Sequence, residues 1–381
     1  MQDFMYEEEH RAFRDAFAAF VEREIVPREE AWREAGKVDR EVWRAAGAGG
    51  FLALSVPEQY GGASQTDFRF NVIVSEVLAR CQVSSVGFNI HTDIVVPLLA
   101  GIGNDEQKGR WLPNCVTGEA ITCIGMTEPK AGSDLQGIHT VAEKQPDGSF
   151  ILNGRKTLIS GGALANLCVI ACKAAADGDH QSMSLLVVED GMEGFSHDRE
   201  LKKIGLNGLD MAELTFENVR VPAENLLGEE GMGFLYLVRG LAQERLIIGL
   251  QSLAMAEAAL EETVAHCQER TAFGRPIGKF QNSRFKLAEM FTEITIGRTF
   301  VDQCIMEHNE GKLTAEKASM AKYWLSELLG RVVDQCLQLH GGHGYIADSP
   351  IAKMYTDARA SRIYGGTNEI MREIIGRSMG F

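Results

Sequence analysis

Apolar residues recur with the spacing of an α-helix along the first third of the chain. Phe13, Phe17 and Phe20 follow one another at steps of four and three, so their side chains would lie on one helical face. Pro57 and Pro97 interrupt this pattern and mark breaks between helices. We therefore predict a helical segment from about residue 6 to residue 116.

The pattern changes between residues 121 and 227, where short runs rich in β-branched residues replace the helical stripes. Asp147–Gly148 and Asn153–Gly154 are pairs typical of tight hairpin turns. The runs that we predict as strands are Ser149–Leu152, Leu167–Ala171, Ser184–Val188 and Glu213–Phe216. Because no helical stretch is available to cross between parallel strands, we predict an antiparallel barrel or sandwich.

The helical pattern returns at about residue 231 and continues to the end of the chain. Leu287, Phe291, Ile294, Val301 and Ile305 share one face, and a second stripe runs from residue 318 to residue 339. Such stripes are typical of long antiparallel helices in a bundle. The predicted fold class is α+β, with an N-terminal helical domain over residues 1–120, a middle antiparallel β-barrel or sandwich domain over 121–228 and a C-terminal four-helix bundle over 229–381.

Charge and cysteine content exclude several classes of protein. The 381 residues carry 38 basic and 53 acidic side chains, a formal net charge of −15. A protein that coats nucleic acid needs basic stripes, so we expect no nucleic-acid partner. The eight cysteines form no CxxC pair and show no Cys/His spacing typical of zinc. We expect reduced thiols and no metal site.

The start of the chain indicates where the protein resides. Glu7, Glu8 and Glu9 fit neither a secretory signal nor an acid-poor transit peptide. No apolar run approaches the roughly 18 residues that a membrane span requires. We therefore expect a cytoplasmic protein with no membrane span.

Two motifs in the chain carry donors suited to a polar ligand. Thr127-Glu128-Pro129, followed by Gly132-Ser133-Asp134, presents backbone N–H groups and hydroxyls that could bind the edge of a heteroaromatic ring, or could form an ordinary capped turn. Arg270 begins the segment Arg270–Pro276. Its planar guanidinium suits a diphosphate, although a solvated Arg at a helix end would look the same.

Two glycine-rich turns follow near the C-terminus. Gly341 and Gly342 come directly after a long helical stretch, which indicates either a helix cap or a backbone that something approaches closely. The neighbouring His343 has no matching Asp, His or Cys spacing, so we interpret it as structural. Tyr364–Thr367 then places a Gly-Gly-Thr turn before a helix, which can bind an anion or a ring, or simply cap the helix.

These four motifs, in this order on a chain that is helical, then β, then helical, resemble the acyl-CoA dehydrogenase family over about residues 8–377. Members are flavoenzymes that oxidise acyl-CoA thioesters to trans-2-enoyl-CoA. The resemblance implies bound FAD, an acyl-CoA substrate, an electron-transfer flavoprotein as electron acceptor, and a homo-oligomer, typically a tetramer, whose cofactor sites are shared between subunits.

The resemblance also assigns site residues. Those that would contact FAD are Ile124, Met126, Thr127, Ser133, Leu158, Ile159, Ser160, Arg270, Phe273, Gln281, Gln338, Gly341, Gly342, Thr367, Asn368 and Glu369. Those that would contact the substrate are Ser133, Arg245, Tyr364 and Gly366. Arg270 would hold the diphosphate, and Gln338, Gly341 and Gly342 match a segment that reaches FAD from a neighbouring subunit. Leu158 stands where the family often has Trp, so a stacking role there is not carried over.

The catalytic position departs from the commonest family pattern. Many members carry the base, a Glu, at the position that is Gly365 here. Glu244, between Gln243 and Arg245, matches the position used by the long-chain and isovaleryl-type members. From the residues alone, a Glu beside an Arg on a helix is usually a solvated surface group. The resemblance instead makes Glu244 the base and leaves Gly365 to contribute its N–H group.

The resemblance predicts FAD-dependent α,β-dehydrogenation of acyl-CoA, with medium or long chains favoured. Glu244 would remove the α-proton, and the β-hydride would pass to flavin N5. Three alternatives remain open: a short branched-chain, isovaleryl-type dehydrogenase, a flavin oxidase or monooxygenase, and an inactive binding homologue with the same fold.

Overall fold

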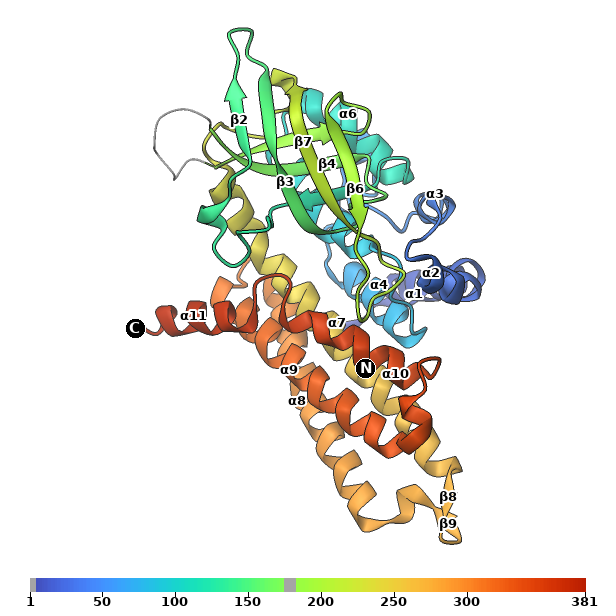
Figure 1. Cartoon of the computed structure of the whole chain (residues 1–381). Coiled ribbons are helices and arrows are strands. Elements are labelled where there is room, and N and C mark those ends of the chain that lie inside the picture. Colours follow the sequence, from blue (N-terminus) through green and yellow to red (C-terminus); the bar gives the residue numbers. More distant parts are fainter. Residues whose placement is uncertain (1–4, 175–182) are drawn as a thin grey trace.

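The computed structural model describes residues 5–174 and 183–381. Helices form both ends of the chain and a β-sheet forms its middle (Figure 1). The predicted α+β class and its order of helical, β and helical parts are confirmed. Among the described residues, no helix is both long enough and apolar enough to cross a bilayer.

The N-terminal part is built from short helices around an aromatic core. Phe17 and Phe20 are buried, and their rings lie 5.0 and 5.1 Å from the ring of Phe51. The α-helices are α1 (Glu8–Phe20), α2 (Glu29–Ala35), α3 (Arg40–Ala48), α4 (Arg69–Arg80), α5 (Val96–Ile102) and α6 (Asp105–Thr117). Short π-helical segments are η2 (Val21–Ile25) and η5 (Ile90–Val95), and short 3-10 helices are η3 (Val26–Arg28) and η4 (Glu58–Tyr60).

The middle part is a seven-stranded sheet in the order β1-β4-β2-β3-β7-β6, with β5 also paired to β4. Its strands are β1 (Thr122–Gly125), β2 (Val141–Lys144), β3 (Phe150–Ser160), β4 (Leu167–Ala174), β5 (Met183–Glu189), β6 (Phe195–Glu200) and β7 (Met211–Val221). Short 3-10 turns are η6 (Leu135–Gly137) and η7 (Ala223–Asn225).

The middle part departs from the predicted antiparallel arrangement at two strand pairings. Strands β1 and β2 both pair with β4 in parallel, while the other pairings in this sheet are antiparallel. The prediction assumed that only a helix can return the chain to a parallel position. Here β3 returns it, because β3 runs antiparallel to β2 and leaves β4 free to lie along the other edge of β2.

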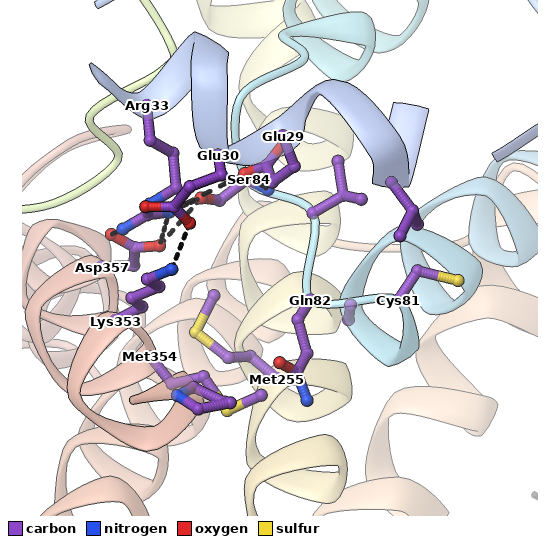
Figure 2. Close-up of a pocket in the computed structure, with 14 residues that line it drawn as sticks. Glu29, Glu30, Arg33, Cys81, Gln82, Ser84, Met255, Lys353, Met354 and Asp357 are labelled. Carbon is purple, nitrogen blue, oxygen red and sulfur yellow. Dashed lines mark hydrogen bonds and ion pairs between the residues drawn. The ribbon is translucent and has the colours of Figure 1, made fainter. Parts of the chain in front are cut away.

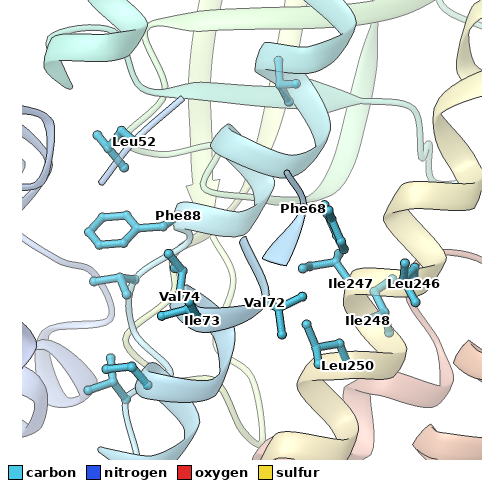
Figure 3. Close-up of a cluster of buried hydrophobic side chains, with 14 of the residues drawn as sticks. Leu52, Phe68, Val72, Ile73, Val74, Phe88, Leu246, Ile247, Ile248 and Leu250 are labelled. Carbon is cyan, nitrogen blue, oxygen red and sulfur yellow. The ribbon is translucent and has the colours of Figure 1, made fainter. Parts of the chain in front are cut away.

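The C-terminal part is a helical bundle around the long helix α7 (Gly233–Glu269), against which α8, α9 and α10 pack. The remaining elements are α8 (Gln281–Asn309), α9 (Ala315–His340), α10 (Pro350–Ala358) and α11 (Asn368–Ser378), the hairpin strands β8 (Thr271–Ala272) and β9 (Arg275–Pro276), and the turns η8 (Ile277–Lys279), η9 (Gly341–Tyr345) and η10 (Arg359–Arg362). Side chains of α4 meet those of α7 in the core that joins the first and third parts (Figure 3).

One residue of the predicted α8 stripe does not lie in the core. Ile294, Val301 and Ile305 are buried as expected, whereas Phe291 is 65% exposed. Phe285 and Ile296 on the same helix are also exposed. Within a single chain, α8 therefore keeps a large part of its apolar surface in contact with solvent.

Candidate active site

The Glu244 carboxylate lies against the turn at Gly365. A Cβ built on Gly365 would be 3.5 Å from Glu244 Oε1 and 2.2 Å from Ile248 Cδ1. Glu244 and Ile248 lie one helical turn apart on α7, so they project from the same face. They occupy the space where a side chain at position 365 would begin. The structure thus brings together two residues that lie 365 − 244 = 121 positions apart in the sequence.

The turn itself requires glycine. Gly365 has a φ of +63° and Gly366 a φ of +84°, and two consecutive left-handed residues are unfavourable for any residue with a Cβ. Thr367 follows as the N-cap of α11, because its Oγ1 accepts a hydrogen bond from the Ile370 N–H at 3.4 Å. Tyr364, which precedes the glycines, is exposed.

A lysine that the sequence motifs did not identify holds this turn. Lys322 on α9 is fully buried, and its Nζ donates to Gly366 O at 2.7 Å and to Asn368 Oδ1 at 2.8 Å. The side-chain oxygen of Asn368 therefore accepts a hydrogen bond inside the protein. The sequence did contain a signal, since Lys322 borders the apolar stripe of Ala318, Ala321 and Leu325, where a charged residue is unexpected.

Charges around Glu244 act on its pKa in opposite directions. Burial raises the pKa of this carboxyl group, and the cations of Arg245 and Lys322 partly offset that effect. Arg245 is itself buried. Its Nη1 lies 3.4 Å from Ser319 Oγ, its Nε has no hydrogen-bond partner among the described residues, and burial lowers its pKa. Two buried cations, Arg245 and Lys322, thus act on the pKa of the base candidate.

The first motif of the β-sheet part is fixed by a buried ion pair. Lys156 Nζ lies 2.7 Å from Glu128 Oε1 and donates to Met126 O at 3.2 Å, and the Thr157 N–H donates to Thr127 O at 3.0 Å. Glu128 also accepts hydrogen bonds from the backbone N–H groups of residues 139 and 140. These bonds place segments 126–128 and 156–158 side by side. Ile124, Met126 and Thr127 remain partly exposed beside them, and Ser133 is exposed.

A bulge in β3 turns Leu158 outward. The register between β3 and β7 shifts between Lys156 and Ile159, and Leu158 has a φ of +58°. A left-handed residue with a branched side chain is strained, and such strain is frequent at functional sites. Leu158 is 55% exposed and Ser160 is partly exposed, whereas the Ile159 side chain lies in the sheet core. Any ligand contact of Ile159 would therefore use its backbone.

The remaining predicted cofactor residues lie at the opposite end of the bundle. Arg270 is 270 − 244 = 26 residues beyond Glu244, and α7 runs to Glu269, which places the two about 39 Å apart. The rings of His266 and His340 stack at 4.1 Å, so the ends of α7 and α9 meet there. The predicted residues at this end are Arg270, Phe273, Gln281, Gln338, Gly341 and Gly342.

These two regions offer groups that fit a flavin dinucleotide. A Cβ on Gly132, Gly341 or Gly342 would meet no atom within 4 Å, so a ligand can approach the backbone at each position. Arg270 is exposed, and its guanidinium suits a diphosphate. Phe273 is 96% exposed. Backbone that a ligand can approach, an exposed guanidinium and exposed apolar side chains are groups that suit the rings and the diphosphate of such a cofactor.

A pocket of about 200 Å³ lies elsewhere, between α2, α7 and α10 (Figure 2). Arg33 crosses it to Asp357, with Nη–Oδ distances of 2.9 and 3.2 Å, and Ser84 donates to the same carboxylate at 2.8 Å. None of the predicted site residues lines it. Since these polar groups pair mainly with one another, we interpret the pocket as a junction between the first and third parts of the chain.

Comparisons with known proteins match nearly the whole chain to one family. The chain matches the family models of the acyl-CoA dehydrogenase N-terminal domain over residues 7–119, the middle domain over 123–219 and the C-terminal domain over 231–380. It is 44% identical over 378 residues to the mitochondrial long-chain specific acyl-CoA dehydrogenase of Sus scrofa, covering 98% of this chain and 87% of that protein.

Solved structures give the same result. The crystal structure of acyl-CoA dehydrogenase from Geobacillus kaustophilus has a TM-score of 0.96 and 47% identity, covering 99% of both chains. An acyl-CoA dehydrogenase complexed with FAD, from Bacillus anthracis, has a TM-score of 0.92 and 29% identity, covering 100% of this chain and 69% of that one.

Replacing Gly365 by Ala tests how tightly the turn is packed. We expect the free energy of unfolding to fall by about 1–3 kcal/mol, because the new methyl group meets Ile248 and the backbone must stay left-handed. The midpoint of urea unfolding measures the change. Gly376→Ala in α11 is the matched control, since a Cβ there meets nothing within 4 Å. An equal loss in both variants would contradict the packing argument.

Proposed function

Because this chain belongs to the acyl-CoA dehydrogenase family of FAD-dependent oxidoreductases, we propose that Glu244 is the base that removes the α-proton from a medium- or long-chain acyl-CoA. The observation that supports this assignment best is the position of Glu244 Oε1, 3.5 Å from where a Cβ at Gly365 would lie. A carboxylate at either position can approach the same substrate carbon.

The α-hydrogen of a thioester is weakly acidic, so the site must stabilise the negative charge that develops on the carbonyl oxygen. We assign this role to the N–H group of Gly365, which a glycine retains. The turn that carries this N–H is held to α9 by Lys322. When bound, FAD supplies the acceptor for the β-hydride at its N5 atom.

Glu244 becomes neutral when it takes up the α-proton. Burial favours that neutral form and raises the pKa of the carboxyl group, which makes Glu244 a stronger base than a solvated Glu. The cations of Arg245 and Lys322 oppose this rise and favour the ionised form that a base needs before the reaction. A base works best when its pKa lies near the working pH, and this balance of burial and charge moves Glu244 towards that range.

We propose an electron-transfer flavoprotein as the electron acceptor, as the family resemblance implies. The cytoplasmic location and the domain limits 1–120, 121–228 and 229–381 stay predictions from the sequence.

We also propose that the working protein is a homo-oligomer, typically a tetramer, with active sites shared between subunits. Glu244 and Arg270 lie about 39 Å apart along α7. The ribityl chain of FAD is too short to connect a flavin ring beside Glu244 with a diphosphate beside Arg270 of the same chain. A second copy must therefore supply the Arg270 end. Phe273, Phe285 and Phe291 are exposed apolar residues in the single chain, which supports an interface over this part of the bundle.

Replacing Glu244 by Gln tests the base assignment. We expect the variant to keep its FAD and to bind acyl-CoA, while the rate of flavin reduction falls by about 10²–10⁴. Stopped-flow absorbance under anaerobic conditions measures this rate. Glu261→Gln, at an exposed position of the same helix, is the control and should behave as wild type. A Glu244→Gln variant that reduces its flavin at a near-normal rate would remove Glu244 from this role.

Substrate preference is tested by anaerobic titration with acyl-CoAs of graded length and branching, followed at the flavin absorbance. The identity to a long-chain relative leads us to expect the fastest bleaching with medium or long straight chains. Preference for isovaleryl-CoA would favour the branched-chain alternative. Rapid reoxidation of the reduced flavin by air would favour an oxidase or monooxygenase, and a flavin that no acyl-CoA bleaches would indicate an inactive homologue.

Subunit sharing is tested by mixing two inactive variants. In a hybrid of Glu244→Gln and Arg270→Ala chains, a shared site combines the intact Glu244 of one chain with the intact Arg270 of the other. Random mixing should then restore about a quarter of the sites, measured as the rate of flavin reduction after co-expression. If each chain builds its own complete site, the mixture will stay inactive.

A further inference from the structure

Lys322 is unusual among the charged residues of the bundle. It lies in the second turn of α9 with no exposed surface, and its Nζ is bonded to one backbone carbonyl and one amide oxygen, Gly366 O and Asn368 Oδ1. Among the ion pairs that the described residues form, none includes Lys322. A buried ammonium group without a carboxylate partner lowers stability, whereas an apolar side chain of similar size would not.

Asn368 is oriented to receive this lysine. Its Nδ2 donates to Ser326 Oγ at 3.0 Å and to Glu327 Oε1 at 2.8 Å, so the amide cannot rotate away, and Oδ1 faces Nζ. Both partners lie on α9 within five residues of Lys322. The start of α11 is thereby attached to α9 at several points. Among the described residues of α9, Lys322 is the one whose side chain also donates to the turn before α11.

The same lysine lies close to the helix that carries Glu244. A Cβ on Gly249 of α7 would be 3.0 Å from the carbonyl carbon of Ala321 and 3.2 Å from the nitrogen of Lys322, so α7 and α9 touch at this level. Gly366, which Lys322 holds, is adjacent to Gly365, and Gly365 faces Glu244. Lys322 therefore donates to the turn at Gly366, while Glu244 lies beside the neighbouring Gly365.

We propose that Lys322 is a positioning residue of the active site, whose ammonium group fixes the turn 365–368 to α9 and places a positive charge behind the Glu244 carboxylate. The inference rests on the proposed role of Glu244. A single buried side chain would then both hold the turn that carries the Gly365 N–H and act on the charge of the base.

The charges around Lys322 and Glu244 determine in which direction the loss of Lys322 would shift the pKa of Glu244. Lys322 is faced by Glu244 and Arg245 of α7, Glu327 of α9 and Glu369 of α11. Burial, and next the charge of Arg245, lowers the pKa of Lys322 to about 8, so the lysine stays mostly protonated at neutral pH. Glu244 is faced by the cations of Arg245 and Lys322, and both lower its pKa against burial. Loss of the Lys322 charge must therefore raise the pKa of Glu244.

The test compares Lys322→Met with Ser326→Ala in the FAD-loaded protein. The first removes the charge and its bonds to Gly366 and Asn368. The second removes the neutral hydrogen bonds between Ser326 and Asn368. We expect Lys322→Met to move the acid limb of the pH profile of kcat/KM to higher pH, because a base must be ionised to act. FAD release on dilution, followed by flavin fluorescence, should show about tenfold or greater weakening, since bonds to a charged group are lost. Ser326→Ala should leave the acid limb where it is.

Lys322→Arg separates charge from geometry if the Met variant folds poorly. It keeps the charge but misplaces the hydrogen bonds, so we expect weaker FAD retention with an unmoved acid limb. An acid limb that is the same in Lys322→Met and wild type would overturn the proposal, and so would an equal shift in Ser326→Ala. Failure of the base assignment is distinguishable, because it appears as normal flavin reduction in Glu244→Gln whatever the Lys322 variants do.

Discussion

The geometry of the candidate site depends on the absence of one side chain. The turn at Gly365 and Gly366 is left-handed at both residues, and only glycine adopts two such conformations in succession without strain. Helix α7 can then approach so closely that Ile248 and Glu244 fill the space beside the turn. The missing side chain and the carboxylate on α7 are therefore two consequences of a single packing arrangement.

This arrangement places charge inside the protein. Lys322 is fully buried and Arg245 nearly so, and both act on the one carboxylate that we assign as the base. In the sheet, Glu128 and Lys156 form a buried pair that fixes the motif expected to meet the flavin. The two cases differ physically. The sheet pair is mutually compensated and structural, whereas the bundle cations are held mainly by neutral oxygens and keep their field directed at Glu244.

The length of α7 bears on whether the protein forms an oligomer, because it separates two parts of the candidate site. One helix carries Glu244 near its start and leads directly into Arg270 at its end, so the residues assigned to the two halves of the cofactor cannot meet within a chain. The exposed phenylalanines of α8 would be unfavourable in a monomer. Both facts have the same explanation if a second copy covers the bundle.

The sequence by itself determined the order of helical, β and helical parts, because periods of 3.6 and 2 can be read locally. It also determined that position 365 lacks a carboxylate and that Glu244 sits on a long helix. Only the tertiary structure decided what Glu244 faces, since residues 121 positions apart meet through packing of α7 against the turn. For the same reason the parallel pairings of β4, the exposure of Phe291 and the burial of Lys322 were decided there. Each depends on which neighbour covers a face, and a linear pattern of apolar and polar residues does not contain that information.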